Sequence, residues 1–423
     1  MGRFTFAHGN ATKLASLPLY ALGALACLVV PRRRGRWVFG SGIGVGEGAL
    51  PLFLHAGSAD PRLKLTWLAR NAAEVAAAAG HGIRAVRKSS LRGLWATLSA
   101  QVVVVTHGFG DANRFGVRDA FVVQLWHGIP LKLIHLDSPA TLRTGVLSGS
   151  TMLRGILRRM YAHASAAISL MPAASPVAAA RLRSAFGLPT DRVVVTGDPR
   201  DDVLCRGTAA ARLAAARETL STVVPLHEFP GCRLLLYAPT WRDGERDPGV
   251  PTPLQWQRIA AYLELTDSVL LIRPHPLGVG EYLAGTTAYE RIMLLASDQV
   301  NDVTPVLPAI DVLITDYSSI AYDFALTDGT IAFLAPDLDG YSRSRGLYQP
   351  YTEFSGGTET DSWDGVLEVL RHSDNDAEFA ARLRTHSARL RAAHHEFLDG
   401  RNTERVYTEI RRRLEPGRAK VRA

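Results

Sequence analysis

A buried strand, a polar loop and the beginning of a helix follow one another in Asp311-Val-Leu-Ile-Thr-Asp-Tyr-Ser-Ser-Ile-Ala-Tyr-Asp-Phe324. The apolar run from Val312 to Ile314 has the length of a strand in a parallel sheet. Hydroxyl and acidic residues interrupt it, and a helical pattern resumes at Ile320. In an open α/β sheet, a loop of this kind lies at the carboxyl end of a strand, where ligands bind.

Asp316, Ser318 and Ser319 in this loop have two interpretations. The first turn of a helix carries unpaired N–H groups and the positive end of the helix dipole, so the loop suits an anion. Alternatively, Asp316 or Ser318 only caps the helix. The stretch taken alone leaves both interpretations open.

Strands alternate with helical segments along most of the 423-residue chain, a pattern typical of doubly wound parallel sheets. The length exceeds what one hydrophobic core supports, so we expect two α/β domains. We predict an N-terminal segment over residues 1–35, an N-terminal domain over 36–215 and a C-terminal domain over 230–423 that ends in basic helices. The expected strands are 37–39, 63–68, 102–105, 121–125 and 193–196 in the first domain, and 233–237, 269–272, 312–314 and 331–334 in the second.

Polar clusters follow three strands of the second domain directly. They are Thr240-Trp241-Arg242, Arg273 with His275, and Asp316 with Ser318 and Ser319. Because parallel strands align their carboxyl ends, we expect the three clusters to converge on one crevice. Arginine binds two phosphate oxygens at once through parallel N–H groups. Hydroxyl and backbone N–H groups donate hydrogen bonds to the remaining lone pairs of the phosphate. The combination therefore predicts a diphosphate site.

Two strands of the first domain each end in His-Gly, at His107 and at His127. An exposed histidine suits general base catalysis near neutral pH. We assign that role to His127, and we expect His107 to be structural. The glycine-rich segment from Gly40 to Gly46 is a weak match to a phosphate loop, and we expect it to let a loop approach the domain cleft.

The formal net charge of +8 and the pI near 9.6 favour an anionic partner, such as a phosphorylated substrate, an acidic lipid surface or nucleic acid. A compositional bias towards arginine and alanine is the alternative. Arginine is scattered through alanine-rich helices rather than interleaved with aromatic residues, which argues against nucleic acid. The three cysteines lie far apart, without metal spacing or a disulfide framework, so a reducing cytosol is expected.

An apolar run from Leu14 to Val30 precedes Pro31-Arg32-Arg33-Arg34. Basic residues after the apolar core argue against a signal peptide, and the run is at the short limit for crossing a bilayer. A helix lying on the membrane surface fits better, held by apolar burial and by attraction of arginine to anionic lipid. A buried helix that packs on the N-terminal domain is an equal alternative.

Five motifs in order resemble the CDP-glycerol glycerophosphotransferase family, whose members prime or polymerise wall teichoic acids and related polyol-phosphate capsules. They are Trp126-His-Gly-Ile-Pro-Leu-Lys132, Gly197-Asp-Pro-Arg-Asp-Asp202, Tyr237-Ala-Pro-Thr-Trp-Arg-Asp243, Arg273-Pro-His-Pro276 and Asp311-Val-Leu-Ile-Thr-Asp-Tyr-Ser-Ser319. Trp37-Val-Phe-Gly-Ser41 also resembles the first strand of the family. The family usually has an aromatic residue at Asp198 and asparagine at Asp201, and residues 133–161 carry no match.

The resemblance implies a GT-B-like fold, with two Rossmann-like domains facing a cleft and the nucleotide in the C-terminal one. It implies transfer from CDP-glycerol or another CDP-polyol, without metal or cofactor, to an undecaprenyl-diphosphate-linked or polyol-phosphate acceptor. The site would then lie at the cytoplasmic face of the membrane, with the protein peripheral to it, and no nucleic acid would bind.

The resemblance also suggests a role for each candidate residue. His127 would be the catalytic base. The groups that bind the donor phosphates would be Thr240, Trp241, Arg242, Arg273, His275, Ser318 and Ser319, with His275 also counted as catalytic. The carboxylate of Asp316 would repel phosphate, so we expect it to hold the loop or to reach polyol hydroxyls.

Two other functions remain open at this point. A GT-B glycosyltransferase that uses a nucleotide sugar would share the architecture and the diphosphate site, although the second domain has no Glu-rich hexose motif. A non-catalytic protein that binds anionic surfaces would use the net positive charge alone.

Overall fold

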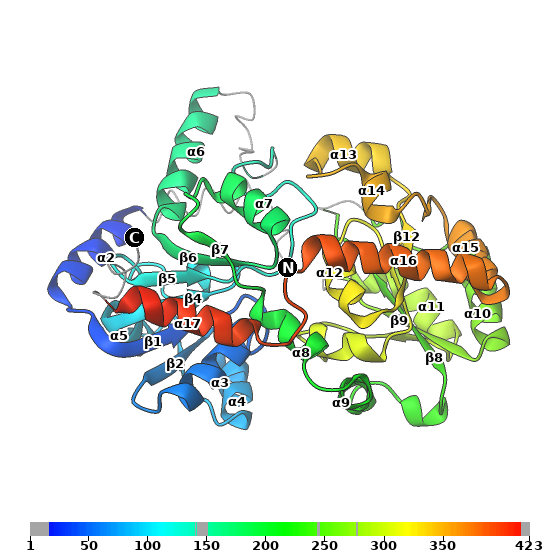
Figure 1. Cartoon of the computed structure of the whole chain (residues 1–423), viewed down its shortest axis with the longest axis horizontal. Helices are drawn as coiled ribbons and strands as arrows, with labels where there is room; N and C mark the ends of the chain where they lie inside the picture. The colour runs from blue at the N-terminus through cyan, green and yellow to red at the C-terminus, as the bar shows by residue number, and fades with distance from the viewer. Residues whose placement is uncertain (1–16, 140, 142–150, 243–245, 276–277, 416–423) are drawn as a thin grey trace, which may run out of the picture. The chain divides into compact units, whose positions relative to one another are not determined.

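The computed structural model describes residues 17–139, 141, 151–242, 246–275 and 278–415, which form two compact α/β units (Figure 1). Within those residues, the N-terminal unit comprises 17–128, 134–202 and 395–415, and the C-terminal unit comprises 129–133 and 203–394. Some predicted features fall outside the described residues. They are residues 1–16 of the N-terminal segment, most of 140–150 within the unmatched stretch 133–161, Asp243 and Pro276 in the motifs, and the tail 416–423.

The N-terminal unit is built on a seven-stranded parallel sheet in the order β3-β2-β1-β4-β5-β6-β7. Its strands are β1 (Arg33–Phe39), β2 (Lys64–Ala69), β3 (Ala85–Arg87), β4 (Ala100–Val105), β5 (Phe121–Gln124), β6 (Ile168–Ala173) and β7 (Val193–Val195). The strand order reverses between β1 and β4, and such a switch point is where doubly wound sheets bind ligands.

Both faces of this sheet carry buried side chains that pack under helices. Trp37 and Phe39 of β1 pack on one face and Val38 on the other, each almost fully buried. The helices are α2 (Leu17–Val29), α3 (Ala49–Ala59), α4 (Ala72–Gly80), α5 (Leu91–Ser99), α6 (Thr151–Ser165), α7 (Pro176–Phe186) and α17 (Asn402–Leu414), with 3-10 turns η1 (Phe109–Asp111) and η2 (Pro199–Asp201). Helix α8 (Asp202–Cys205) crosses the boundary between the units.

The chain returns to the N-terminal unit at its carboxyl end, through α17. The Asp202 carboxylate accepts hydrogen bonds from the backbone N–H groups of Asn402 (2.8 Å) and Thr403 (2.9 Å) at the start of this helix. Val406 and Ile410 are fully buried in the core of the unit. Residues 395–415 therefore pack on the N-terminal unit, although the sequence alone places 230–423 in one C-terminal domain.

The Gly197–Asp202 motif contacts the beginning of helix α17 and the segment before it. The side-chain amide of Asn402 donates to the backbone carbonyl of Asp198 at 3.1 Å, and His395 Nδ1 lies 3.3 Å from Asp201 Oδ2 in a buried pair. Gly197 has φ +77°, and a Cβ there would lie 2.0 Å from Asn402 Oδ1. Glycine is required at this position by both the backbone conformation and the close approach.

The C-terminal unit is built on a six-stranded parallel sheet in the order β10-β9-β8-β11-β12-β13. Its strands are β8 (Arg233–Ala238), β9 (Ser268–Ile272), β10 (Ile292–Leu294), β11 (Val312–Thr315), β12 (Thr330–Leu334) and β13 (Glu359–Thr360). The switch point lies between β8 and β11, whose last residues, Ala238 and Thr315, are paired in register. Both units thus confirm the predicted GT-B-like class of two Rossmann-like α/β sheets.

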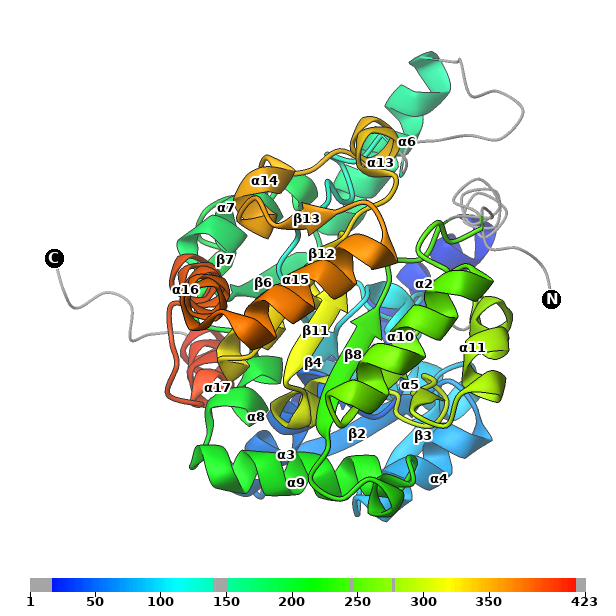
Figure 2. The ribbon, with the colours of Figure 1, turned by 90° about the vertical axis from the view of Figure 1, so that its right-hand side faces the viewer.

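Helices α10 (Pro253–Leu265) and α15 (Trp363–Asn375) cover one face of this sheet, in front of β8 and β11 in Figure 2. Trp256, Tyr262 and Trp363 are the largest side chains that they bury in the core. The remaining elements are α9 (Ala209–Ser221), η3 (Leu226–Glu228), η4 (Val279–Tyr282), α11 (Leu283–Ala288), η5 (Thr304–Ala309), α12 (Ile320–Phe324), η6 (Ala325–Thr327), α13 (Leu338–Arg345), α14 (Tyr351–Ser355) and α16 (Ala377–His394).

Helix α2 forms from the N-terminal apolar run, and one side of it packs on the unit. The Tyr20 and Phe115 rings meet edge to face at 5.0 Å, and a Cβ at Gly23 would lie 2.2 Å from the Phe115 carbonyl oxygen. Arg32, just beyond the helix, donates to the carbonyls of Ala100 (3.0 Å) and Gly116 (2.8 Å). Among the described residues, no helix is both long enough and apolar enough to cross a membrane.

The close approach at Gly197 generates a stability prediction. We expect Gly197→Ala to lower the free energy of unfolding by about 3 kcal/mol, because a left-handed backbone strains alanine by about 1–2 kcal/mol and the displaced Asn402 adds an overpacking cost. Gly82→Ala is the matched control, because Gly82 has φ +67° in the same unit with nothing within 4 Å of its Cβ position. Scanning calorimetry should show a markedly larger fall in melting temperature for Gly197→Ala, and equal falls would contradict the clash.

Candidate functional site

The carboxylate of Asp316 ties the ends of β8 and β11 together at the switch point of the C-terminal unit. Its two oxygens accept the backbone N–H of Thr240 at 2.9 and 3.0 Å, and Oδ1 also accepts the N–H of Tyr317 at 2.6 Å. The Thr315 hydroxyl donates to the Ala238 carbonyl at 2.7 Å. Two of the three predicted clusters therefore meet here, and Asp316 holds the loops of both.

Arg242 is buried and meets two carboxylates. Its Nη1 donates to Asp316 Oδ2 at 3.0 Å, and its Nε and Nη2 donate to the two oxygens of Asp337, both at 2.9 Å. The guanidinium carbon also lies 4.7 Å from the ring centre of Tyr341 and 5.2 Å from that of Tyr317. The Arg242 guanidinium group, which we predicted from the sequence to bind phosphate, thus binds Asp337. A buried arginine requires a carboxylate partner.

This ion-pair cluster is stable at neutral pH. Burial alone would lower the pKa of Arg242, but its hydrogen bonds to Asp337 and the charges of both carboxylates outweigh burial and raise it. Burial would likewise raise the pKa of Asp337, yet Arg242 holds that pKa below its ordinary value. A carboxyl with a depressed pKa contributes stability that is present above its unfolded-state pKa and is lost as the pH falls through the folded-state pKa. The cluster therefore weakens only in acid.

Arg273 follows β9 and makes a different set of contacts. Its guanidinium donates to the backbone carbonyls of Leu295 (3.3 Å) and Asn301 (3.2 Å). Burial lowers the pKa of Arg273 to about 10, and the charge of Asp302 opposes that effect only in part. Arg273 is therefore a partly buried cation at neutral pH, held by carbonyl groups, and it suits an anionic ligand better than Arg242 does.

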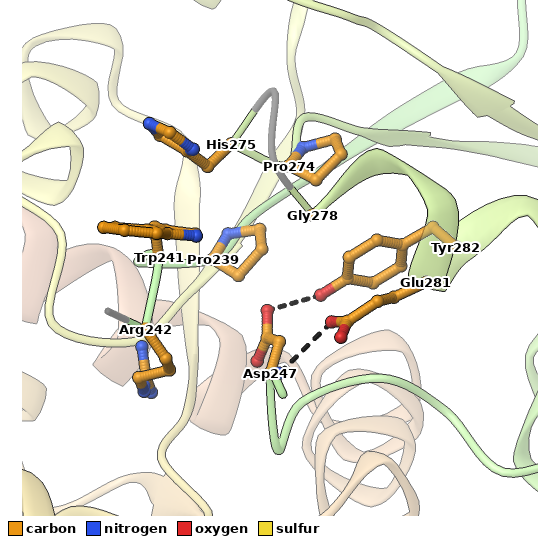
Figure 3. Close-up of a pocket in the computed structure, with 9 residues that line it drawn as sticks. All are labelled: Pro239, Trp241, Arg242, Asp247, Pro274, His275, Gly278, Glu281 and Tyr282. Atoms are coloured by element: carbon orange, nitrogen blue, oxygen red, sulfur yellow. Dashed lines mark hydrogen bonds between the residues drawn. The ribbon is translucent and has the colours of Figure 1, made fainter. Parts of the chain in front are cut away.

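Trp241 and His275 stack on each other at 4.9 Å and line a pocket, shown in Figure 3 with His275 on one side of the Trp241 ring and Arg242 on the other. The residues that line it are Pro239, Trp241, Arg242, Asp247, Pro274, His275, Gly278, Glu281 and Tyr282. This pocket brings the second predicted cluster to the first, because Trp241 comes from the loop after β8 and His275 from the loop after β9.

Two acidic residues in this pocket were not predicted from the sequence. Asp247 Oδ2 accepts the Tyr282 hydroxyl at 2.6 Å, and Glu281 Oε2 accepts the backbone N–H of Asp247 at 3.1 Å (Figure 3). Burial raises the pKa of Asp247. Neither residue directly follows an apolar strand, so the pattern that identified the other residues carries no signal for them. Carboxylates repel phosphate and accept hydroxyl groups, so this pocket suits the hydroxyl-rich part of a ligand.

Ser318 and Ser319 are half-buried at the start of α12, and they do not line the pocket. Ser318 Oγ accepts the N–H of Ile320 at 3.4 Å, which is a weak local contact. The helix has five residues, so the dipole that favours an anion at its start is small. The Thr240 hydroxyl is buried nearby and has no hydrogen-bond partner among the described residues.

His127 belongs to the N-terminal unit, where a strained loop after β5 presents it. Trp126 has φ +66° and Gly128 has φ +132°, and a positive φ is uncommon for a bulky residue such as tryptophan. The Trp126 ring lies 4.1 Å from the His127 ring and meets Phe186 edge to face. Arg200 Nη1 donates to the His127 carbonyl at 3.1 Å. Contacts to both the backbone and the ring of His127 thus hold this residue in place.

His107, which the sequence treats as structural, stacks on His127. It follows β4 at the switch point between β1 and β4, which places both histidines at the carboxyl edge of the N-terminal sheet. In the part of the chain that the structure describes, no three His, Cys, Asp or Glu side chains gather in a way that would hold a metal ion.

The Arg242 cluster leads to a prediction about stability. We expect Arg242→Lys to lower the free energy of unfolding by about 3–5 kcal/mol, because lysine lacks the fork and leaves a buried carboxylate without a full partner. Arg258→Lys is the matched control, because its pair with Asp364 is half exposed and contributes at most about 1 kcal/mol. Thermal unfolding of both variants measures the difference, and a loss for Arg242→Lys as small as that for Arg258→Lys would show that the cluster is not a stabilising element.

The chain is similar to several known proteins. The model of the family described as CDP-glycerol:poly(glycerophosphate) glycerophosphotransferase matches residues 28–412. The teichoic acid ribitol-phosphate polymerase TarK of Staphylococcus aureus is 29% identical over 231 residues, which are 54% of this chain and 42% of that protein. The teichoic acid glycerol-phosphate transferase of the same organism is 25% identical over 315 residues, which are 72% of this chain and 75% of that protein.

The fold is also that of a solved structure of the wall teichoic acid polymerase TagF. The TM-score is 0.74 at 21% identity, and the match covers 97% of both chains. The chain spans less than half the length of TarK and of the ribitol-phosphate polymerase TarL, 42% and 48% respectively. Because the family model covers most of the sequence, including every described site residue above, the chain belongs to the CDP-glycerol:poly(glycerophosphate) glycerophosphotransferase family.

Proposed function

We propose that this protein transfers a glycerol-phosphate or related polyol-phosphate unit from a CDP-polyol to a hydroxyl group of a lipid-linked cell-wall or capsule polymer, with release of CMP. The observation that carries the proposal is the family match over residues 28–412, which contain both switch-point clusters. Relatives named for ribitol phosphate and for glycerol phosphate are similar to the chain, so both polyols belong in the test. In this proposal the C-terminal unit binds the donor, and the N-terminal unit serves the acceptor.

In the proposed reaction, His127 accepts the proton of the acceptor hydroxyl. The oxygen attacks the phosphorus that bears the polyol, the bond from that phosphorus to CMP breaks, and a phosphodiester forms. Arg273, His275 and the hydroxyl groups of Ser318 and Ser319 stabilise the charge on the phosphoryl oxygens, where electrostatics and positioning supply most of the rate.

The contacts of the C-terminal unit support a division of tasks within the donor site. Arg242 holds the floor of the pocket through Asp316 and Asp337 rather than meeting the phosphates itself. Asp247 and Glu281 accept hydroxyl groups of the ribose or the polyol. The buried Thr240 hydroxyl and the stacked Trp241 and His275 rings complete the surface that receives the nucleotide.

A donor panel tests this function. We expect CMP release from CDP-glycerol or CDP-ribitol in the presence of a polyol-phosphate acceptor, and no UMP or UDP release from nucleotide sugars. His127→Ala should lower turnover by about 10²–10⁴-fold, because the base is lost. Arg273→Ala should lower turnover by about 10²–10³-fold, because a group that donates hydrogen bonds to the phosphate is lost. Arg258→Ala, on the exposed side of α10, is the control and should retain full turnover.

The other outcomes of the panel point to the alternatives. UDP or UMP release from a nucleotide sugar would indicate a glycosyltransferase. Salt-sensitive binding to nucleic acid, without affinity for CDP compounds, would indicate a non-catalytic anion-binding protein. Near-normal turnover of His127→Ala would exclude this residue as the base.

Helix α2 supports a peripheral site at the cytoplasmic face of the membrane. Leu22, Leu25 and Leu28 on its outer side are 62%, 59% and 69% exposed, and the exposed Arg33 and Arg34 follow the helix. Exposed leucines beside arginines suit the boundary between headgroups and acyl chains of an anionic bilayer. Arg32 is not part of this surface, because backbone carbonyls hold it.

Vesicle sedimentation tests the membrane proposal. We expect the double substitution Leu22→Asp and Leu25→Asp to weaken binding to vesicles rich in phosphatidylglycerol by about tenfold or more, because two apolar contacts are lost and the new carboxylates repel anionic lipid. Leu265→Asp is the control, because this 83% exposed leucine lies at the end of α10. Cell fractionation of the full chain and of a chain without residues 1–31 gives a second measure, and equal solubility of the two would contradict the proposal.

A further inference from the structure

The rings of His107 and His127 lie flat on each other, with centres 4.1 Å apart and planes 6° from parallel. They come from neighbouring strands, because β4 and β5 pair up to Val105 and Gln124. Such face-to-face contact between two histidines restricts the rotation of each ring about its side-chain bonds. The orientation of the proposed base therefore depends on what holds His107.

A chain of hydrogen bonds runs from His107 to Glu47, a carboxylate that is only 7% exposed. Ser41 Oγ donates to Glu47 Oε2 at 2.7 Å, and Thr106 Oγ1 donates to Ser41 Oγ at 3.1 Å. The contact between Thr106 Oγ1 and His107 Nδ1 is 2.9 Å. The direction of the first two bonds follows from the carboxylate, which only accepts when ionised.

The same chain determines which nitrogen of His107 carries a proton. A hydroxyl group has one proton to donate, and Thr106 uses that proton in its hydrogen bond to Ser41. Donation from Thr106 to Asp111 Oδ2, at 3.5 Å, would use that proton as well. In either case Thr106 Oγ1 accepts from His107. His107 Nδ1 also lies 3.5 Å from Glu47 Oε2, so both contacts favour a proton on Nδ1. The His107 imidazole is thus held by a hydrogen bond as well as by its stacking on His127.

Two loops hold this arrangement. The Asp111 carboxylate accepts the backbone N–H groups of Thr106 (3.0 Å), His107 (2.6 Å) and Gly108 (3.3 Å), which fixes the loop after β4. A Cβ at Gly42 would lie 2.5 Å from the His107 ring. The glycine-rich segment after β1, which resembles a phosphate loop in the sequence, therefore makes room for His107.

We propose that His107 is a positioning residue for His127. Held by Thr106, Ser41 and Glu47, its ring keeps the His127 imidazole in the orientation that accepts the proton of the acceptor hydroxyl. The inference rests on the proposed transferase function, in which His127 is the base.

Kinetics of three variants test the positioning role. We expect His107→Ala to lower kcat by about tenfold to a hundredfold, as a small misplacement of a catalytic group does, with KM for CDP-glycerol unchanged. His107→Phe keeps a ring face against His127 but loses the Nδ1 contacts to Thr106 and Glu47, so it should recover only part of the lost kcat. His81→Ala, an exposed histidine after α4, is the control and should match the unaltered enzyme. Full kcat in His107→Ala, or a His107→Phe enzyme as slow as His107→Ala, would overturn the proposal.

A second readout does not depend on activity. Nitrogen-15 NMR of histidine-labelled full-length protein should show His107 protonated at Nδ1. The His127 ring protons should be displaced by the His107 ring current, and should move in His107→Ala but stay near their place in His107→Phe. An unprotonated Nδ1, or His127 signals unmoved in His107→Ala, would overturn the geometry. No CMP release from any CDP-polyol by the unaltered enzyme would instead refute the transferase function, while the NMR result would still decide the ring contact.

Discussion

The buried carboxylate of Asp316 is the interaction on which the C-terminal site depends. It joins the ends of the two central strands by accepting the N–H groups of Thr240 and Tyr317, and it requires a cation because a buried unpaired charge is costly. Arg242 supplies that cation and in turn requires Asp337. The polar residues at the switch point therefore stabilise one another before any ligand arrives, and the remaining groups line the pocket around them.

The N-terminal unit uses the same principle with different chemistry. Its sheet has the same strand order around the switch point, and there a buried carboxylate, Glu47, organises the loops through Ser41 and Thr106. In both units a carboxylate between two strand ends fixes a neighbouring group, an arginine in one and a histidine in the other. The same strand order around the switch point thus carries different polar side chains in the two units, because the residues that follow the strands differ.

Most of the strands that the sequence predicts contain a continuous apolar run that is buried on both faces, such as Val102–Val105 and Val312–Ile314. Strands β3, β10 and β13 were not predicted, because they are two or three residues long at an edge and lack the run of valines that identified the equally short edge strand β7. Strand β6 escapes because Pro172 interrupts its pattern. The site follows the same division, because residues directly after a strand were identified, whereas Glu47, Asp247 and Glu281 reach their places from segments without a strand signal.

The sequence by itself determined where the strands end, which polar side chains stand at those ends and which family the chain resembles, because each of these is a local property. Only the tertiary structure decided which partner each side chain takes. Arg242 pairs with Asp337, 95 residues further along the chain. His107 stacks on His127, and α17 returns to the N-terminal unit to be capped by Asp202. Such choices depend on burial, because a charge or a donor removed from water takes whichever partner the fold brings within reach, however distant in sequence.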